Sequence, residues 1–360
     1  MATDPAVIAA ARDAARRLDP AHPIHIASSL EALTRLVGPG EPPRHMVIHH
    51  AIAHGALLSA ARDRFLSTEI VVVAAPGESV PQGLRSVPAE GARLAEALAG
   101  PARGVPLPAV DAAALAESLD RDEITVRFQP VVRLADRRPV GVEALARWER
   151  PGLALGAGAF VALAEREGLA RALTLAVARR AIADFAAARG RSGLRLAFNV
   201  PLEVMLMPGL PVALLAATRR AGLRPGDLLL ELTESTEVRD AGLLRRALTR
   251  LRDAGFGVLL DDLGIDDARD ALLNLPFAGV KLDRSLVDAL PQERRARARV
   301  ERLARHARRT GSVLIAEGVS DPRLWRAAAS SGCDLAQGFA VGRPIPPEAL
   351  PAWVSAWSGS

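Results

Sequence analysis

The sequence predicts an α/β protein in which a barrel of alternating strands and helices follows a smaller α/β domain. Apolar strand patterns alternate with helical patterns along most of the 360 residues. A stretch rich in proline and glycine, residues 100–108, separates a shorter first part from a longer second part. The second part holds about eight strand patterns in roughly 240 residues, the size of a (β/α)8-type barrel. We therefore place a small α/β domain at residues 1–109 and the barrel at residues 110–360.

The first domain is expected to hold a small, mostly parallel sheet with covering helices, because helical and strand patterns alternate. The expected helices span residues 5–18, 29–37, 53–65 and 89–98, and the expected strands span residues 24–27, 46–49 and 70–75. This order resembles a response-regulator receiver domain in a degenerate form. His49 and His50 stand where such domains carry a phosphoacceptor aspartate, so we expect no phosphate transfer by that route. The histidines at 45, 49, 50 and 54 favour a surface or interface cluster, since no cysteine or acid completes a metal-ligand set.

The second domain begins with a short helix at residues 111–119 and a hairpin at residues 124–148. The first hairpin strand alternates apolar and polar residues from Ile124, and the second is expected at Val140 to Ala144. The hairpin stretch ends in Glu143-Ala144-Leu145-Ala146-Arg147-Trp148. The strands expected after it span residues 194–200, 228–232, 257–261, 279–283, 312–316 and 335–340. The expected helices span residues 159–167, 171–188, 241–254, 292–309 and 322–330.

Composition excludes several classes of protein. A hydrophobic fraction of 49% with 24% charged residues predicts a packed core and argues against disorder. The net charge of +5 is spread over helix faces, aromatics are 3% and tyrosine is absent, so polymeric nucleic acid is not an expected partner. No apolar run approaches the ~20 residues of a spanning helix, so we expect no membrane insertion. With the single cysteine, Cys333, this favours the cytoplasm.

Polar side chains fall where successive strands of the second domain end. They are Glu143, Asn199, Glu231 with Glu234, Asp261 with Asp262, Lys281 with Asp283, Glu317 and Gln337. The carboxyl ends of barrel strands meet on one face, where barrel enzymes build their sites. Converging carboxylates repel one another, so a bound cation is expected, and oxygen ligands without His or Cys select Mg²⁺ or Mn²⁺. For any single residue of the set, capping of the following helix is the alternative role.

Lys281 stands out for a second reason. It is the only lysine, although the chain has 46 Lys and Arg residues together. Because a guanidinium is planar and always charged, a lone lysine favours a position that needs a compact, titratable amine; chance is the alternative explanation.

Taken in order, these motifs resemble the EAL-domain family of cyclic di-GMP phosphodiesterases. The resemblance implies a modified TIM (β/α)8-type barrel whose first strand runs antiparallel. It also implies hydrolysis of cyclic di-GMP to linear pGpG by attack of water, assisted by Mg²⁺ or Mn²⁺.

The resemblance further implies a role for each matching residue. Glu143, Asn199, Glu231 and Asp261 would bind a first metal ion, and Asp261 with Asp262 a second. Lys281 and Glu317 would hold and deprotonate the attacking water, with Glu317 as the general base. Gln129, Leu145, Arg147 and Gln337 resemble residues that contact the substrate, and Glu234 resembles the residue that steadies the loop after Asp262.

The loop after Asp262 departs from the family pattern. Residues 263–269 read Leu-Gly-Ile-Asp-Asp-Ala-Arg, whereas the family usually has Phe-Gly-Thr-Gly-Tyr-Ser-Ser, a loop that organises the second metal and the dimer contact. Ala278 replaces a frequent Asp, and Ser320 replaces a frequent Glu.

Two functions therefore stay open. Retention of every expected ligand and of the base favours an active phosphodiesterase. The altered loop favours a catalytically inactive cyclic di-GMP receptor that acts on an unknown protein partner through residues 1–109. A homodimer is compatible with both functions. A third alternative is a barrel that acts on another phosphate ester.

Overall fold

The structure is a computed structural model that describes residues 5–18, 45–49, 69–75, 78, 85–99, 111–150, 153–190, 192–233, 238 and 240–358. The chain divides into two compact units, Met1–Glu117 with Trp148–Leu163, and Ser118–Arg147 with Ala164–Ser360. The predicted boundary between residues 109 and 110 lies outside the described residues and stays a prediction.

The first unit contains a three-stranded parallel sheet. Its strands are β1 (His45–His49), β2 (Glu69–Val73) and β3 (Arg85–Val87), in the order β1-β2-β3. Helices α1 (Pro5–Leu18) and α4 (Gly91–Ala99) pack Ala14 and Leu94 against Val71 and Val73 of the central strand. The predicted strands at 46–49 and 70–75 and the helices at 5–18 and 89–98 are confirmed. The elements predicted at 24–27, 29–37 and 53–65 lie outside the described residues, and the receiver resemblance stays a prediction.

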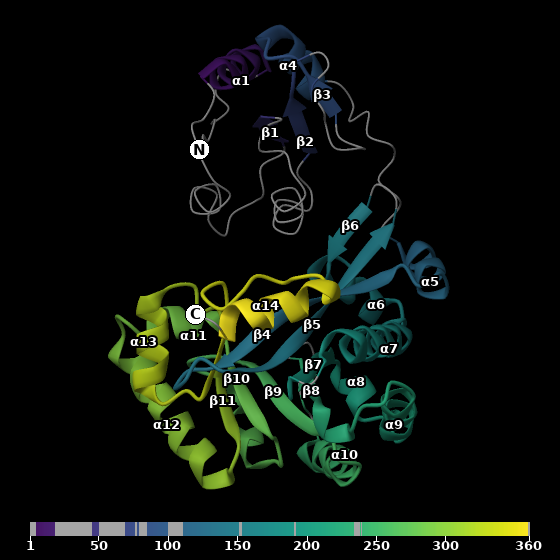
Figure 1. Cartoon of the computed structure of the whole chain (residues 1–360), viewed down its shortest axis with the longest axis vertical. Helices are drawn as coiled ribbons and strands as arrows, with labels where there is room; N and C mark the ends of the chain where they lie inside the picture. The colour runs from purple at the N-terminus through teal and green to yellow at the C-terminus, as the bar shows by residue number, and fades with distance from the viewer. Residues whose placement is uncertain are drawn as a thin grey trace. The chain divides into compact units, whose positions relative to one another are not determined.

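Eight strands close into a barrel (Figure 1). They are β4 (Ile124–Arg133), β5 (Pro139–Arg150), β7 (Arg195–Val200), β8 (Leu228–Leu232), β9 (Gly257–Leu263), β10 (Gly279–Leu282), β11 (Val313–Ala316) and β12 (Leu335–Gln337). The order is β4-β12-β11-β10-β9-β8-β7-β5, and β5 pairs back with β4. β4 runs antiparallel to β12, while the ladders from β7 to β12 are parallel. The predicted barrel with an antiparallel first strand is therefore confirmed.

Helices surround these strands (Figure 1). Around the barrel lie α7 (Ala170–Ala188), α8 (Leu202–Met205), α9 (Leu210–Arg220), α10 (Ala241–Asp253), α11 (Arg284–Ala289), α12 (Arg294–Thr310), α13 (Pro322–Ser331) and α14 (Leu350–Ser358). Helices α5 (Ala112–Asp120) and α6 (Val161–Arg166) span the division between the two units. Local signals fix several of their ends. Asp240 and Asp321 accept hydrogen bonds from the first turns of α10 and α13, and left-handed Gly311 and Gly332 end α12 and α13. No helix within the described ranges has the length and apolar character of a membrane span.

Apolar side chains fill the interior of the barrel below its carboxyl face. Val131, Leu259 and Ile315 are buried together there. Gly279 lies in the same layer, where a Cβ would approach Val313 and the Leu259 side chain to 3.0 Å or less. Because side chains alternate along a strand, the residue two positions further on points inward again, one layer higher. That step leads from Leu259 to Asp261, from Gly279 to Lys281, from Ile315 to Glu317, from Leu229 to Glu231 and from Leu335 to Gln337.

The second hairpin strand is longer than predicted. We expected it to end near Glu143, but β5 continues to Arg150, so Glu143 is not at the strand terminus. Its parallel ladder with β7 covers only the stretch from Gly141 to Ala144, opposite Arg195 to Phe198. Beyond this ladder β5 pairs with the following strand, β6 (Leu153–Gly156). Trp148 in this extension is buried and packs edge-on against Phe160, with ring centroids 5.9 Å apart. Glu143 thus lies at the end of the barrel portion of the strand.

Candidate active site

A β-bulge brings two adjacent acids to the carboxyl face of the barrel. Val280 pairs with Leu260 and Leu282 pairs with Leu263, so Asp261 and Asp262 together stand opposite Lys281. Asp262 has a φ of 54°, in the left-handed region that residues other than glycine seldom adopt. Bulges next to active sites re-aim side chains. Here the bulge lets two consecutive carboxylates serve one site.

Lys281 lies at the centre of the site. Its Nζ is 2.5 Å from Glu317 Oε1, 2.9 Å from Glu231 Oε2 and 3.0 Å from Asp261 Oδ1. A fourth carboxylate oxygen, Glu143 Oε2, lies 3.4 Å away. The lysine side chain is only 2% exposed, so its charge is balanced by these acids and not by bulk water.

Side-chain amides hold Glu143 in place. Asn199 Nδ2 donates to Glu143 Oε1 over 3.0 Å, and Gln337 Nε2 donates to Glu143 Oε2 over 2.6 Å. Gln337 Nε2 also donates to Gln129 Oε1 at 3.1 Å. The network therefore leaves one buried acceptor, Gln337 Oε1, without a hydrogen-bond partner among the described residues.

The acids of the site have widely separated pKa values. Burial raises the pKa of Glu317 to about 8 and that of Asp261 to about 6, although Lys281 opposes both shifts. Burial and the neighbouring Glu143 carboxylate raise the pKa of Glu231 well above its usual range. Burial alone would also raise the pKa of Glu143, but Lys281 and the hydrogen bond from Gln337 lower it. Desolvation opposes the charge of Lys281, yet the carboxylates, Glu143 foremost, raise the pKa of this ammonium well above its ordinary value. Lys281 and Glu143 thus form the ionised pair. Ionisation of the other acids would add negative charge that the single Lys281 ammonium cannot neutralise.

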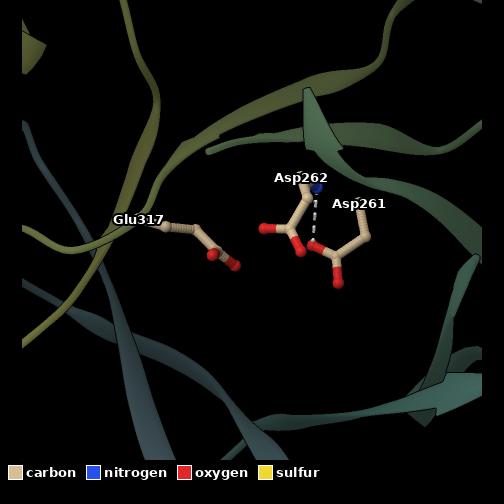
Figure 2. A group of neighbouring side chains, drawn as sticks. All are labelled: Asp261, Asp262 and Glu317. Atoms are coloured by element: carbon tan, nitrogen blue, oxygen red, sulfur yellow. Dashed lines mark hydrogen bonds between the residues drawn. The ribbon is translucent and has the colours of Figure 1, made fainter. Parts of the chain in front are cut away.

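The donor set suits a hard divalent cation. Asp261, Asp262 and Glu317 each offer a carboxylate oxygen, and these oxygens all lie within 4.8 Å of one another. Figure 2 shows the three carboxylates turned toward a common space. Oxygen ligands without histidine or cysteine are typical of Mg²⁺ and Mn²⁺ sites. The surplus of buried negative charge around Lys281 also calls for an additional positive charge.

The structure brings together most, but not all, of the residues predicted for the site. One linked network contains Glu143, Asn199, Glu231, Asp261, Lys281, Glu317, Gln337 and Gln129. Leu145 is half-buried on β5, and Arg147 donates from Nη1 to the carbonyl of Ala146 over 2.9 Å. Glu234 lies outside the described residues. Asp283 caps α11 through Ser285 N at 2.8 Å, the alternative role expected of a strand-end acid.

Sequence reasoning missed two residues that support the site. Arg269 Nη1 donates to the carbonyl of Asp261 over 2.7 Å, and Asp267 accepts from Arg269 Nε over 2.9 Å. Both belong to the loop that departs from the expected motif. The sequence did show Asp-Asp-Ala-Arg where a glycine- and serine-rich loop was expected. The spacing of these residues, however, does not predict which backbone carbonyl the arginine contacts.

The fold and the site together define this protein as a closed α/β barrel whose carboxyl face carries acids, an amide and a lysine, a donor set that suits a divalent cation. A sequence profile of the EAL domain matches residues 112–344. The chain belongs to the EAL domain family.

Named relatives support this membership. The bifunctional diguanylate cyclase/cyclic di-GMP phosphodiesterase MucR of Pseudomonas aeruginosa is 32% identical over 67% of this chain and 36% of MucR. The cyclic di-GMP phosphodiesterase NbdA of the same organism is 32% identical over 68% of this chain and 32% of NbdA. A third relative, an uncharacterised signalling protein of Caulobacter vibrioides, is 34% identical over 67% of this chain and 30% of the relative. The chain thus spans about a third of the length of these relatives.

Solved structures agree with this assignment. The MucR phosphodiesterase in complex with cyclic di-GMP is 31% identical, with a TM-score of 0.60 over 66% of this chain and 98% of that chain. The EAL domain of DcpA from Mycobacterium smegmatis is 28% identical, with a TM-score of 0.53 over 64% of this chain and 96% of that chain.

Proposed function

We propose that this chain hydrolyses cyclic di-GMP to linear pGpG in a reaction that depends on Mg²⁺ or Mn²⁺. The observation that carries the proposal is the buried group of Glu143, Glu231, Asp261 and Glu317 around Lys281 Nζ, on the carboxyl face of an EAL barrel. Relatives named as cyclic di-GMP phosphodiesterases and a related structure that holds cyclic di-GMP support the choice of substrate.

The ligand assignment follows the donors of the site. Glu143, Asn199, Glu231 and Asp261 would hold one divalent cation, and Asp261 with Asp262 would hold a second. Such a pair supplies a water of lowered pKa and stabilises charge on the attacking and leaving oxygens of a phosphodiester. Both aspartates precede the altered loop, and the bulge that holds them leaves a carboxylate oxygen of each within 4.8 Å of one of Glu317.

Glu317 is the proposed general base. It takes one proton from the attacking water as the oxygen of that water bonds to phosphorus; one P–O ester bond breaks, and the leaving ribose oxygen takes a proton from solvent to become the hydroxyl of pGpG. A base works best with a pKa near the operating pH; burial raises the pKa of Glu317 to about 8 in the metal-free protein, and a divalent cation bound beside it would lower that pKa. Lys281, 2.5 Å away, steadies the carboxylate and places positive charge beside the phosphoryl oxygens as negative charge develops there.

Four residues would bind the substrate. Gln129 and Gln337 present amides at the barrel mouth, and Gln337 Oε1 offers a buried acceptor for an N–H or O–H donor. Arg147 suits a phosphate oxygen and Leu145 an apolar contact. Glu234 keeps its proposed role in steadying the loop after Asp262. We infer that residues 1–109 serve regulation through a protein partner or a second copy of the chain.

The test is chromatography of cyclic di-GMP incubated with purified protein and Mg²⁺ or Mn²⁺. The linear dinucleotide should appear with the unmodified protein and not with Glu317→Gln, which keeps the shape of the side chain but cannot accept the proton as a carboxylate. Glu301→Gln, at an exposed position on α12, is the matched control and should retain turnover. Saturable binding of cyclic di-GMP without turnover would instead identify a receptor.

A further inference from the structure

The loop that follows the aspartate pair folds back onto the backbone of that pair. Arg269 Nη1 donates to the carbonyl of Asp261 over 2.7 Å, and Arg269 Nη2 donates to the carbonyl of Asp262. These are the two residues of the bulge, and Asp262 has the left-handed backbone. Such a conformation persists only where surrounding contacts fix it.

Asp267 holds the Arg269 guanidinium in this position. Its Oδ1 accepts from Arg269 Nε at 2.9 Å and its Oδ2 accepts from Arg269 Nη2 at 2.7 Å. The same carboxylate accepts from the amide of Gly264 at 3.0 Å and from the amide of Arg269 at 2.9 Å. One carboxylate thus binds both ends of the turn, Gly264 and Arg269, together with the Arg269 guanidinium.

Two arginines of helix α12 also contact this loop. Arg299, a buried residue, donates from Nε to the carbonyl of Gly264 over 3.3 Å and pairs with both oxygens of Asp270. Arg295 pairs with Asp266 at 2.6 Å, but both side chains are exposed. Of these arginines, Arg269 is the one that donates to the carbonyls of the aspartate pair.

We propose that Arg269, locked by Asp267, is a positioning residue that sets the bulge and thereby aims the Asp262 carboxylate at the divalent-cation site. The inference rests on the proposed metal-dependent function. A guanidinium suits this role because its planar fork can serve two carbonyls and one carboxylate together, which an ammonium cannot do with the same geometry. The arginine and its aspartate thus do the work of the glycine- and serine-rich loop expected at this place.

The test is the affinity for Mn²⁺, measured by titration calorimetry on the full chain after removal of bound metal. Loss of a group that orients a metal ligand typically weakens metal binding by about 10- to 100-fold, and we expect this for Arg269→Ala. The Mn²⁺ concentration for half-maximal turnover should rise by the same factor, while turnover at saturating Mn²⁺ stays near that of the unmodified protein. Arg295→Ala is the matched control, because it breaks an exposed pair of the same loop without touching the bulge.

Two further variants separate positioning from charge and from folding. Arg269→Lys keeps the charge but not the fork, so it should weaken Mn²⁺ binding nearly as much as alanine. In an Asp262→Asn background, Arg269→Ala should cause little additional loss, since a residue that acts through Asp262 has nothing left to aim. If Arg269→Ala does not fold, Asp267→Asn and Arg269→Lys carry the same test.

The outcomes separate this inference from the proposed function. Wild-type Mn²⁺ affinity in folded Arg269→Ala or in Arg269→Lys would overturn the positioning role and leave the phosphodiesterase intact. An unmodified protein that binds no Mn²⁺ and leaves cyclic di-GMP intact would overturn the proposed function and this inference together.

Discussion

Replacing Lys281 by methionine removes the ammonium that contacts four carboxylates and keeps an unbranched side chain of similar length. In metal-free protein at pH 8, the variant would leave buried carboxylates without a counter-charge. Removal of one partner of a buried ion pair costs about 3–5 kcal/mol of folding free energy. For a barrel of this size, that corresponds to a fall in melting temperature of about 6–20 °C.

The loss of folding free energy caused by Lys281→Met should be smaller at lower pH. The pKa values of Asp261 and Glu317 are raised to about 6 and about 8, above those of the unfolded chain. Stability from these groups is therefore present at low pH and declines as the pH rises from about 4 through about 6 and about 8. At pH 5 both acids are protonated in the folded protein, so Lys281→Met leaves fewer unpaired charges than at pH 8.

Differential scanning calorimetry after EDTA treatment measures both effects. Arg180→Met provides the matched control, because Arg180 pairs with Asp184 on the exposed side of α7, where such pairs contribute about 0.3–0.5 kcal/mol. If Lys281→Met melted no lower than this control at pH 8, or if its deficit grew toward pH 5, Lys281 would not be the counter-charge of the site.

Three further predictions concern separate parts of the barrel. Glu143→Ala should abolish Mg²⁺-dependent turnover with the fold kept, as checked by chromatography and circular dichroism; unchanged turnover would refute Glu143 as a ligand. Burial raises the pKa of Cys333 to about 12, so iodoacetamide at pH 8 should modify this thiol in urea but not in the folded protein, by mass spectrometry. Gly338 has a φ of 148°, and a Cβ there would lie 2.3 Å from the Val319 backbone. Gly338→Ala should therefore cost about 1–3 kcal/mol in denaturant melts, and Gly158→Ala, in open space, should cost less.

The strand-end residues were predictable because alternation along a strand is local. Once Leu259 and Ile315 are assigned to the barrel interior, Asp261 and Glu317 must share that face one step higher. The single lysine was a second local signal, and Lys281 does lie at the centre of the network.

Other features depend on pairing between distant segments. The bulge at Asp261 and Asp262 arises from the register between β9 and β10, which the residues of β9 alone do not specify. The hydrogen bonds from Arg269 to the carbonyls of the bulge therefore could not be predicted from the sequence. The extension of β5 past Glu143 follows from its partner β6 and from the burial of Trp148. Helix α9 was also missed, because a run such as Leu-Leu-Ala-Ala does not separate helix from strand by period alone.

The pairing of β4 with β12 has a consequence for synthesis on the ribosome. β4 is the first barrel strand to be made and β12 is the last, yet they are hydrogen-bonded neighbours. Gln337 reaches Glu143 across 194 residues of chain and Gln129 across 208. A nascent chain that lacks β12 has an open sheet with two unpaired edges, which are prone to association with other chains. Ring closure and completion of the Glu143 network therefore occur in one late event, after all eight barrel strands have emerged.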